Sequence, residues 1–169
     1  MSGNDLLIDG FGRIREIVHE VLEGVDAADL DFRADAAANS ISWLIWHLTR
    51  VQDDHIAAVA GLEQVWLSGS WEERCGLPLD PLDTGYGHGS KDVAAVRLGE
   101  DLLTGYHDAT YEQTVSFISG LTETDMGKVV DQRWDPPVTM ATRLVSVLAD
   151  DLEHAGQAAF IKGLLDRRD

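Results

Sequence analysis

Apolar residues recur at helical spacing in four long segments of the chain. The first runs over about 4–23 and is followed by Gly24, a residue that tolerates the left-handed conformation at which many helices end. The second begins at Asn39 or Ser40, both good N-cap residues, and ends near Gly61. No segment alternates convincingly between apolar and polar residues, so the pattern indicates helices and no strands.

The other two segments lie in the second half of the chain. A short helical turn at 93–99 leads into a long helix over about 100–119, which Gly120 closes. After a rigid turn at 134–137, the last helix runs over about 138–165.

Residues 63–90, between the second and third long helices, contain seven glycines and prolines, which predicts a long irregular loop. Such a loop is uncommon in a compact domain unless it covers a functional site. Together the segments predict an all-α fold, a four-helix bundle with a long crossover between helices 2 and 3. The length fits one domain spanning 1–169.

Composition narrows the possible partners. The chain has 30 Asp+Glu against 13 Lys+Arg, a net charge of −17, which disfavours binding to nucleic acid or to anionic membranes. No apolar run approaches the roughly 20 residues that span a bilayer, and the N-terminal residues lack a signal-peptide pattern, so we expect cytoplasmic residence. The single cysteine, Cys75, excludes a disulfide or a cysteine-based zinc site within one chain.

Asp150 and His154 are the first candidates for chemistry. They lie four residues apart in the last predicted helix, on one face, in a row with the apolar Val147 and Ile161. Ionisable groups in an apolar row need a partner, because burial of an unpaired charge is costly. The pair could share a divalent ion or form a His–Asp hydrogen bond at the core edge.

Asp151 leaves this assignment open. It lies three residues before His154 in a row that is just as apolar, and periodicity cannot choose between the two aspartates. The aspartate that does not bind a metal would orient His154 instead.

The second helix offers His47 and His55, about 12 Å apart along the axis and so too far apart to share one ion. The apolar pattern slightly favours His55 as the buried histidine, because His47 lies at the edge of the stripe. His19, His88 and His107 show no ligand spacing and are expected at the surface.

Two motifs resemble those of the DinB-like superfamily, which includes mycothiol-dependent maleylpyruvate isomerases and bacillithiol-type transferases. Trp43-x-x-x-His47-Leu48 resembles its W-x-x-x-H-L stretch, and Asp150-x-x-x-His154-x-Gly-Gln resembles its last-helix motif. The order of helices and motifs also agrees over essentially the whole chain.

The resemblance implies that His47, Asp150 and His154 bind one divalent metal, and it overrules the preference for His55. Many members carry His or Glu where this chain has the shorter Asp150, which leaves the metal preference open. His55 and Asp54 then become candidates for the substrate pocket.

Two histidines and a carboxylate leave coordination positions open, as in catalytic sites. We therefore expect a metal-dependent enzyme that activates a low-molecular-weight thiol or water for a small-molecule substrate: a thiol transferase, isomerase or hydrolase. Zinc is favoured, with nickel or another ion as the alternative. Trp66, Trp71, Tyr86 and His88 would contact the substrate or simply pin the loop by packing. The competing hypothesis is a non-catalytic, metal-binding or stress-related homodimer, and a third is a scaffold that has lost its metal.

Overall fold

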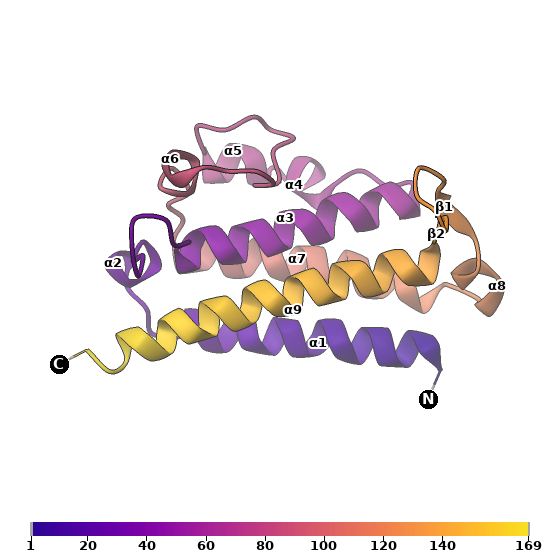
Figure 1. Ribbon diagram of the computed structural model, residues 1–169, viewed down its shortest axis with the longest axis horizontal. Helices are drawn as coiled ribbons and strands as arrows, with labels where there is room; N and C mark the ends of the chain where they lie inside the picture. The colour runs from indigo at the N-terminus through magenta and orange to yellow at the C-terminus, as the bar shows by residue number, and fades with distance from the viewer. Residues whose placement is uncertain (1, 169) are drawn as a thin grey trace.

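Four long helices form the body of the protein in the computed structural model, which describes residues 2–168 (Figure 1). They are α1 (Gly3–Leu22), α3 (Ile41–Ala60), α7 (Glu100–Ser119) and α9 (Met140–Leu165). A long crossover connects α3 to α7. The prediction of an all-α four-helix bundle with this crossover is confirmed.

Local sequence fixes where these helices begin and end. Ser2 and Asp5 form a capping box at the start of α1, and the side chains of Ser40 and Thr139 accept first-turn N–H groups of α3 and α9. Gly61 ends α3 in the left-handed conformation, with φ of 67°. The capping residues therefore explain the boundaries that could be read from sequence.

Each long helix packs against two others. α3 contacts α7 and α9, α1 contacts the same two, and α1 and α3 lie diagonally opposite. α1 runs parallel to α9, while α3 and α7 run the other way (Figure 1). Fourteen of the twenty residues of α3 are buried, because the crossover covers the side of α3 that faces away from the bundle (Figure 1).

The crossover is more ordered than the sequence suggested. It contains three short helices, α4 (Val65–Ser68), α5 (Trp71–Cys75) and α6 (Ser90–Val93). The prediction of an irregular loop over 63–90 is wrong for these turns, and the turn expected at 93–99 is helical only at its first residue. Trp66 and Trp71 are buried among the core residues, which confirms the packing alternative for both.

A buried polar network fastens the crossover to α3. The Asp53 carboxylate accepts the backbone N–H groups of the first two residues of α4, each at 2.8 Å, and the Tyr106 hydroxyl at 2.8 Å. Arg50 donates from Nε to the carbonyl of Asp83 at 3.0 Å and from Nη1 to the Tyr106 hydroxyl at 3.2 Å. Most of the polar groups on this side of α3 are therefore paired.

Further short elements complete the chain: α2 (Ala27–Leu30), α8 (Glu123–Met126), β1 (Val129–Asp131) and β2 (Val138–Thr139). β1 and β2 pair antiparallel, so the expectation of no strands is wrong, and α9 begins after β2 rather than at 138. Strands of two and three residues are too short to show alternation. Within residues 2–168, no helix is long and apolar enough to cross a membrane.

Candidate metal centre

The structure brings the three predicted ligands together between α3 and α9. His47 comes from α3, and Asp150 and His154 lie one turn apart on the facing side of α9. One ligand atom from each lies within 4.8 Å of the other two, and His154 Nε2 is 3.9 Å from Asp150 Oδ2. Residues more than 100 positions apart in sequence thus form one compact triad.

His47 is held in the tautomer that a metal ligand needs. Its side chain is buried, and Nδ1 donates to the backbone carbonyl of Thr84, which can only accept. The lone pair of Nε2 is therefore free. Burial lowers the pKa of His47, although the hydrogen bond to Thr84 acts in the opposite direction, so the imidazole is neutral at neutral pH.

The crossover packs closely around His47. Gly85 has a φ of 90°, and a Cβ there would lie 2.7 Å from Nδ1 of His47. The Trp43 ring stacks on His47 with centroids 4.4 Å apart, and its Nε1 donates to His88 Nδ1 at 3.0 Å. His88 Nε2 in turn donates to the Asp83 carboxylate at 2.9 Å. This chain of contacts fixes the ring orientation of His47.

His154 is oriented from its own helix. Its Nδ1 lies 3.3 Å from Oε1 of Gln157, an acceptor, which leaves Nε2 facing the triad. The His47 and His154 rings lie 4.8 Å apart between centroids at an angle of 71°. Both imidazoles therefore offer a free nitrogen to the same region.

Asp150 supplies the observation that favours a cation. Its side chain is 41% exposed as a whole, but its Oδ2 atom is buried and has no hydrogen-bond partner among the described residues. A buried carboxylate oxygen without a partner is costly, and a bound cation relieves that cost. Zinc bonds to histidine nitrogen and carboxylate oxygen are about 2.0–2.2 Å long, so small side-chain rotations would bring three atoms this close onto one ion. The donor set fits a divalent metal.

Asp151 takes no part in the triad. Its side chain points into the bundle core, is fully buried, and has no hydrogen-bond partner for either oxygen within residues 2–168. Burial, and then the charge of Asp150, raise the pKa of Asp151 well above its usual value. The structure thus separates the two aspartates, and the idea that Asp151 orients His154 is wrong, because Gln157 does so.

Residues 6–167 match the family model described as mycothiol-S-transferase. The chain belongs to the mycothiol-S-transferase family. This confirms the resemblance to the DinB-like superfamily. A crystal structure described as a conserved protein from Enterococcus faecalis has the same fold, with a TM-score of 0.93, 30% sequence identity and 99% of each chain covered. Among curated proteins, no sequence matches this one significantly.

In this mycothiol-S-transferase family member, a pocket of about 800 Å³ lies along α3 and α9 about two helical turns from the triad; we call it the polar pocket because half of its lining residues are ionisable. Its lining includes His55 and Asp54 from α3, Arg143 from α9 and the turn between β1 and β2. His55 is half-exposed, so the prediction that it is the more buried histidine is wrong. The reason is that α3 is covered by the crossover around His47 but opens to this pocket one turn before its end.

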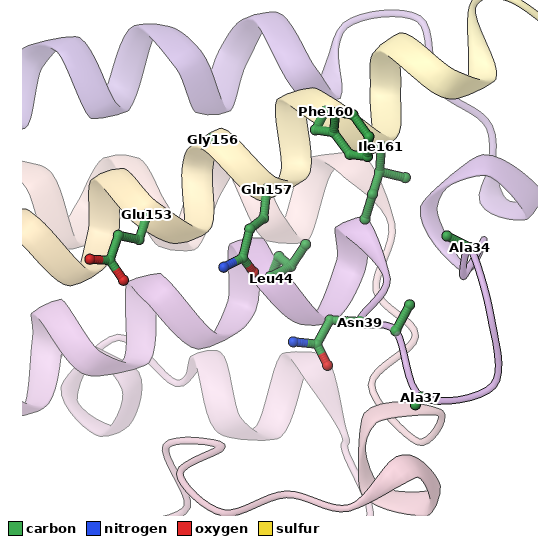
Figure 2. A pocket seen from close by; sticks show the side chains of 10 residues that line it. Ala34, Ala37, Asn39, Leu44, Glu153, Gly156, Gln157, Phe160 and Ile161 are labelled. Carbon is green, nitrogen blue, oxygen red and sulfur yellow. The ribbon is translucent and has the colours of Figure 1, made fainter.

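A second, apolar pocket of about 600 Å³ lies beside the first turn of α3 and the second half of α9 (Figure 2). Leu44 reaches it from the first turn of α3, Asn39 from the residue before the N-cap of α3, and Gln157, Phe160 and Ile161 from α9 (Figure 2). The amide of Gln157, which contacts His154, forms the boundary between this pocket and the triad.

Two histidines expected at the surface are buried. His107 is 1% exposed on α7 and lies 3.1 Å from the Thr49 hydroxyl, and burial lowers the pKa of His107 to about 4. His88 is packed between tryptophans beside His47. Helical spacing from Leu103 and Thr110 could have indicated the burial of His107, whereas only tertiary structure shows that of His88.

Proposed function

We propose that this chain is a divalent-metal-dependent enzyme that joins a low-molecular-weight thiol to a small electrophile, with 1–169 acting as one domain. The family match over residues 6–167 supports thiol transfer, since the family is named for a mycothiol S-transferase. The observation that carries the metal is the buried, unpartnered Oδ2 of Asp150 beside two free imidazole nitrogens.

His47, Asp150 and His154 would hold the ion, and zinc is the proposed metal, with nickel as the alternative. A divalent ion held by three protein ligands keeps positions open and lowers the pKa of a bound thiol or water. Thr84 and Gln157 keep the two imidazoles in the required tautomers. The stacked ring of Trp43 excludes water from one side of His47.

The proposed transfer forms one carbon–sulfur bond and breaks the bond between that carbon and its leaving group. The thiol releases its proton to solvent, its sulfur forms a bond to the electrophilic carbon, and the leaving group departs with the electrons of its bond to that carbon. Asp54 and His55 line the polar pocket and contact the substrate in this proposal. Isomerisation or hydrolysis would use the same triad with a different substrate, and cytoplasmic residence stays a prediction from the sequence.

Turnover with an electrophile panel tests the proposal. Purified protein is assayed with several thiols, mycothiol among them, before and after removal of metal with a chelator. We expect thiol-dependent turnover that chelation abolishes and added Zn²⁺ restores. Protein that binds metal but shows no turnover with any thiol would contradict the enzyme and favour a non-catalytic metal-binding module, for which a homodimer in solution would be further support.

A further inference from the structure

Along the α3–α9 pair, the triad lies between two pockets that differ in polarity. α3 and α9 run antiparallel, so the start of α3 lies beside the end of α9 (Figure 1). Leu44 lies one turn before His47, and Gln157 one turn after His154, and both line the apolar pocket. The polar pocket lies at the opposite end of the same helix pair. Neither pocket is lined by a triad residue, so a ligand at the triad would have to extend about one helical turn to enter the apolar pocket and about two turns to enter the polar one.

The apolar pocket is lined mainly by hydrocarbon. Its apolar residues are Ala34, Ala37, Ala38, Leu44, Phe160 and Ile161. Among residues 2–168, Glu153 is the only ionisable residue that lines it, and Figure 2 shows the Phe160 ring beside Ile161 at the end of the pocket away from Glu153. Phe160 is 65% exposed, so a non-polar ligand would cover apolar surface that now faces water.

The polar pocket offers hydrogen-bond donors and acceptors instead. Arg143 Nη2 donates to Asp131 Oδ2 at 3.1 Å, and Arg133 Nη2 donates to the same oxygen at 2.8 Å. Asp54 and His55 complete the lining from α3. Two guanidinium groups that share one carboxylate, with further acceptors nearby, suit a ligand with several polar groups.

We infer that the two pockets sort the two substrates of the transfer by polarity. The non-polar part of the electrophile occupies the apolar pocket, and the polar carrier of the thiol occupies the polar pocket. This rests on the proposed function, because a transfer needs both substrates to meet at one site. Arg143 lies seven residues before Asp150, about 10 Å along α9, so the thiol carrier must extend about that far from its sulfur.

Binding of a homologous series of S-alkyl conjugates of glutathione, methyl to octyl, whose γ-glutamyl arm is long enough to extend toward Arg143, tests this inference without any need for turnover. Such a conjugate carries a polar thiol carrier and an alkyl group in one molecule. Isothermal titration calorimetry is run on the full chain with one equivalent of Zn²⁺. Affinity is expected to rise about fourfold for each added methylene until the apolar pocket is filled.

Variants show which pocket causes the gain in affinity per methylene. Ala38→Glu places a charge in the apolar pocket and should abolish the gain per methylene, and Phe160→Ala, at a mostly exposed position, should reduce it. Ala58→Glu is the matched control, since it puts the same charge into the polar pocket and should leave the gain unchanged. Arg143→Gln should weaken every member of the series by about tenfold with the same gain per methylene.

No gain per methylene in the natural chain, or a gain that survives both Ala38→Glu and Phe160→Ala, would overturn the inference. A gain lost in Ala58→Glu but not in Ala38→Glu would reverse the two assignments and overturn it as well. Failure of the proposed function would show differently, as absent turnover in the thiol assay whatever the binding series gives.

Discussion

Helix α3 has polar residues on two sides, and these differ in how completely their polar groups are hydrogen-bonded. Toward the crossover, Asp53 accepts three hydrogen bonds and Arg50 reaches both Tyr106 and a crossover carbonyl. Toward α9, His47 faces an Asp150 oxygen that is buried and unpartnered among the described residues. Paired buried groups fasten a fold, whereas the unpartnered Asp150 oxygen favours a cation because it lies beside two imidazole nitrogens. Lack of a partner alone does not mark a ligand site, since Nη2 of Arg50 and both oxygens of Asp151 are also buried and unpartnered among the described residues.

The crossover side should carry the larger share of stability. Asp53→Ala removes the acceptor of three hydrogen bonds and leaves the Arg50 guanidinium buried without its carboxylate, so we expect a loss of about 3–5 kcal/mol in the free energy of unfolding. Urea denaturation measures it. Asp54, the next residue on the same helix, is half-exposed and accepts only one hydrogen bond, from Gln64 Nε2 at 2.7 Å, so Asp54→Ala should cost only about 1 kcal/mol. Equal losses in the two variants would contradict the anchoring role of the network.

His107, in the bundle interior, should have an intermediate effect on stability. Burial holds its pKa at about 4, against about 6.5 in the unfolded chain. Between these values the unfolded chain takes up a proton that the folded chain does not, so the free energy of unfolding falls as pH drops from 6.5 to 4. The neutral His107 contributes about 3 kcal/mol to the free energy of unfolding above pH 6.5, and this contribution is lost as pH falls to 4.

Denaturation curves of the natural chain and of His107→Gln over this pH range isolate that contribution from the carboxylates. The difference in stability between the two proteins should shrink or reverse as pH falls. A difference that is constant from pH 7 to pH 4 would show that His107 does not stay neutral in the folded state.

On the side of α3 that faces α9, metal affinity should depend on the crossover, because Gly85 packs against His47. Gly85→Ala adds a Cβ 2.7 Å from His47 Nδ1, so we expect at least a tenfold loss of Zn²⁺ affinity as the ring is displaced, with a stability loss of about 1–2 kcal/mol. Gly87→Ala is the control, because Gly87 also has a positive φ, of 78°, but no atom within 4 Å of the added Cβ. Equal metal affinity in the two variants would remove the proposed link between the crossover and His47.

Substitution of Cys75 should have the smallest effect of these changes. Cys75 lies on the crossover side, and burial raises the pKa of its thiol to about 11, so little thiolate forms at neutral pH. Cys75→Ser should leave thiol-dependent turnover unchanged, and the folded protein should react slowly with Ellman's reagent. Loss of turnover in this variant would place a protein thiol in the reaction and contradict the proposed role of a free small thiol.

The sequence allowed the long helices to be predicted because apolar spacing and capping residues are local signals. It also placed Asp150 and His154 on one face of α9. Three features lay beyond it: the choice of His47 over His55, the separation of Asp150 from Asp151, and the role of Thr84. The first came only from the family resemblance, and all three depend on how the crossover and the core pack around α3 and α9.

Metal content tests the central claim most directly. The full chain, purified without a polyhistidine tag and equilibrated with Zn²⁺, is analysed by inductively coupled plasma mass spectrometry beside a His47→Ala/His154→Ala double variant. His19→Ala and His55→Ala, which alter histidines outside the triad, serve as controls. We predict about one metal per chain in the natural protein and both controls, and none in the double variant. Equal metal content in the natural chain and the double variant would contradict the account.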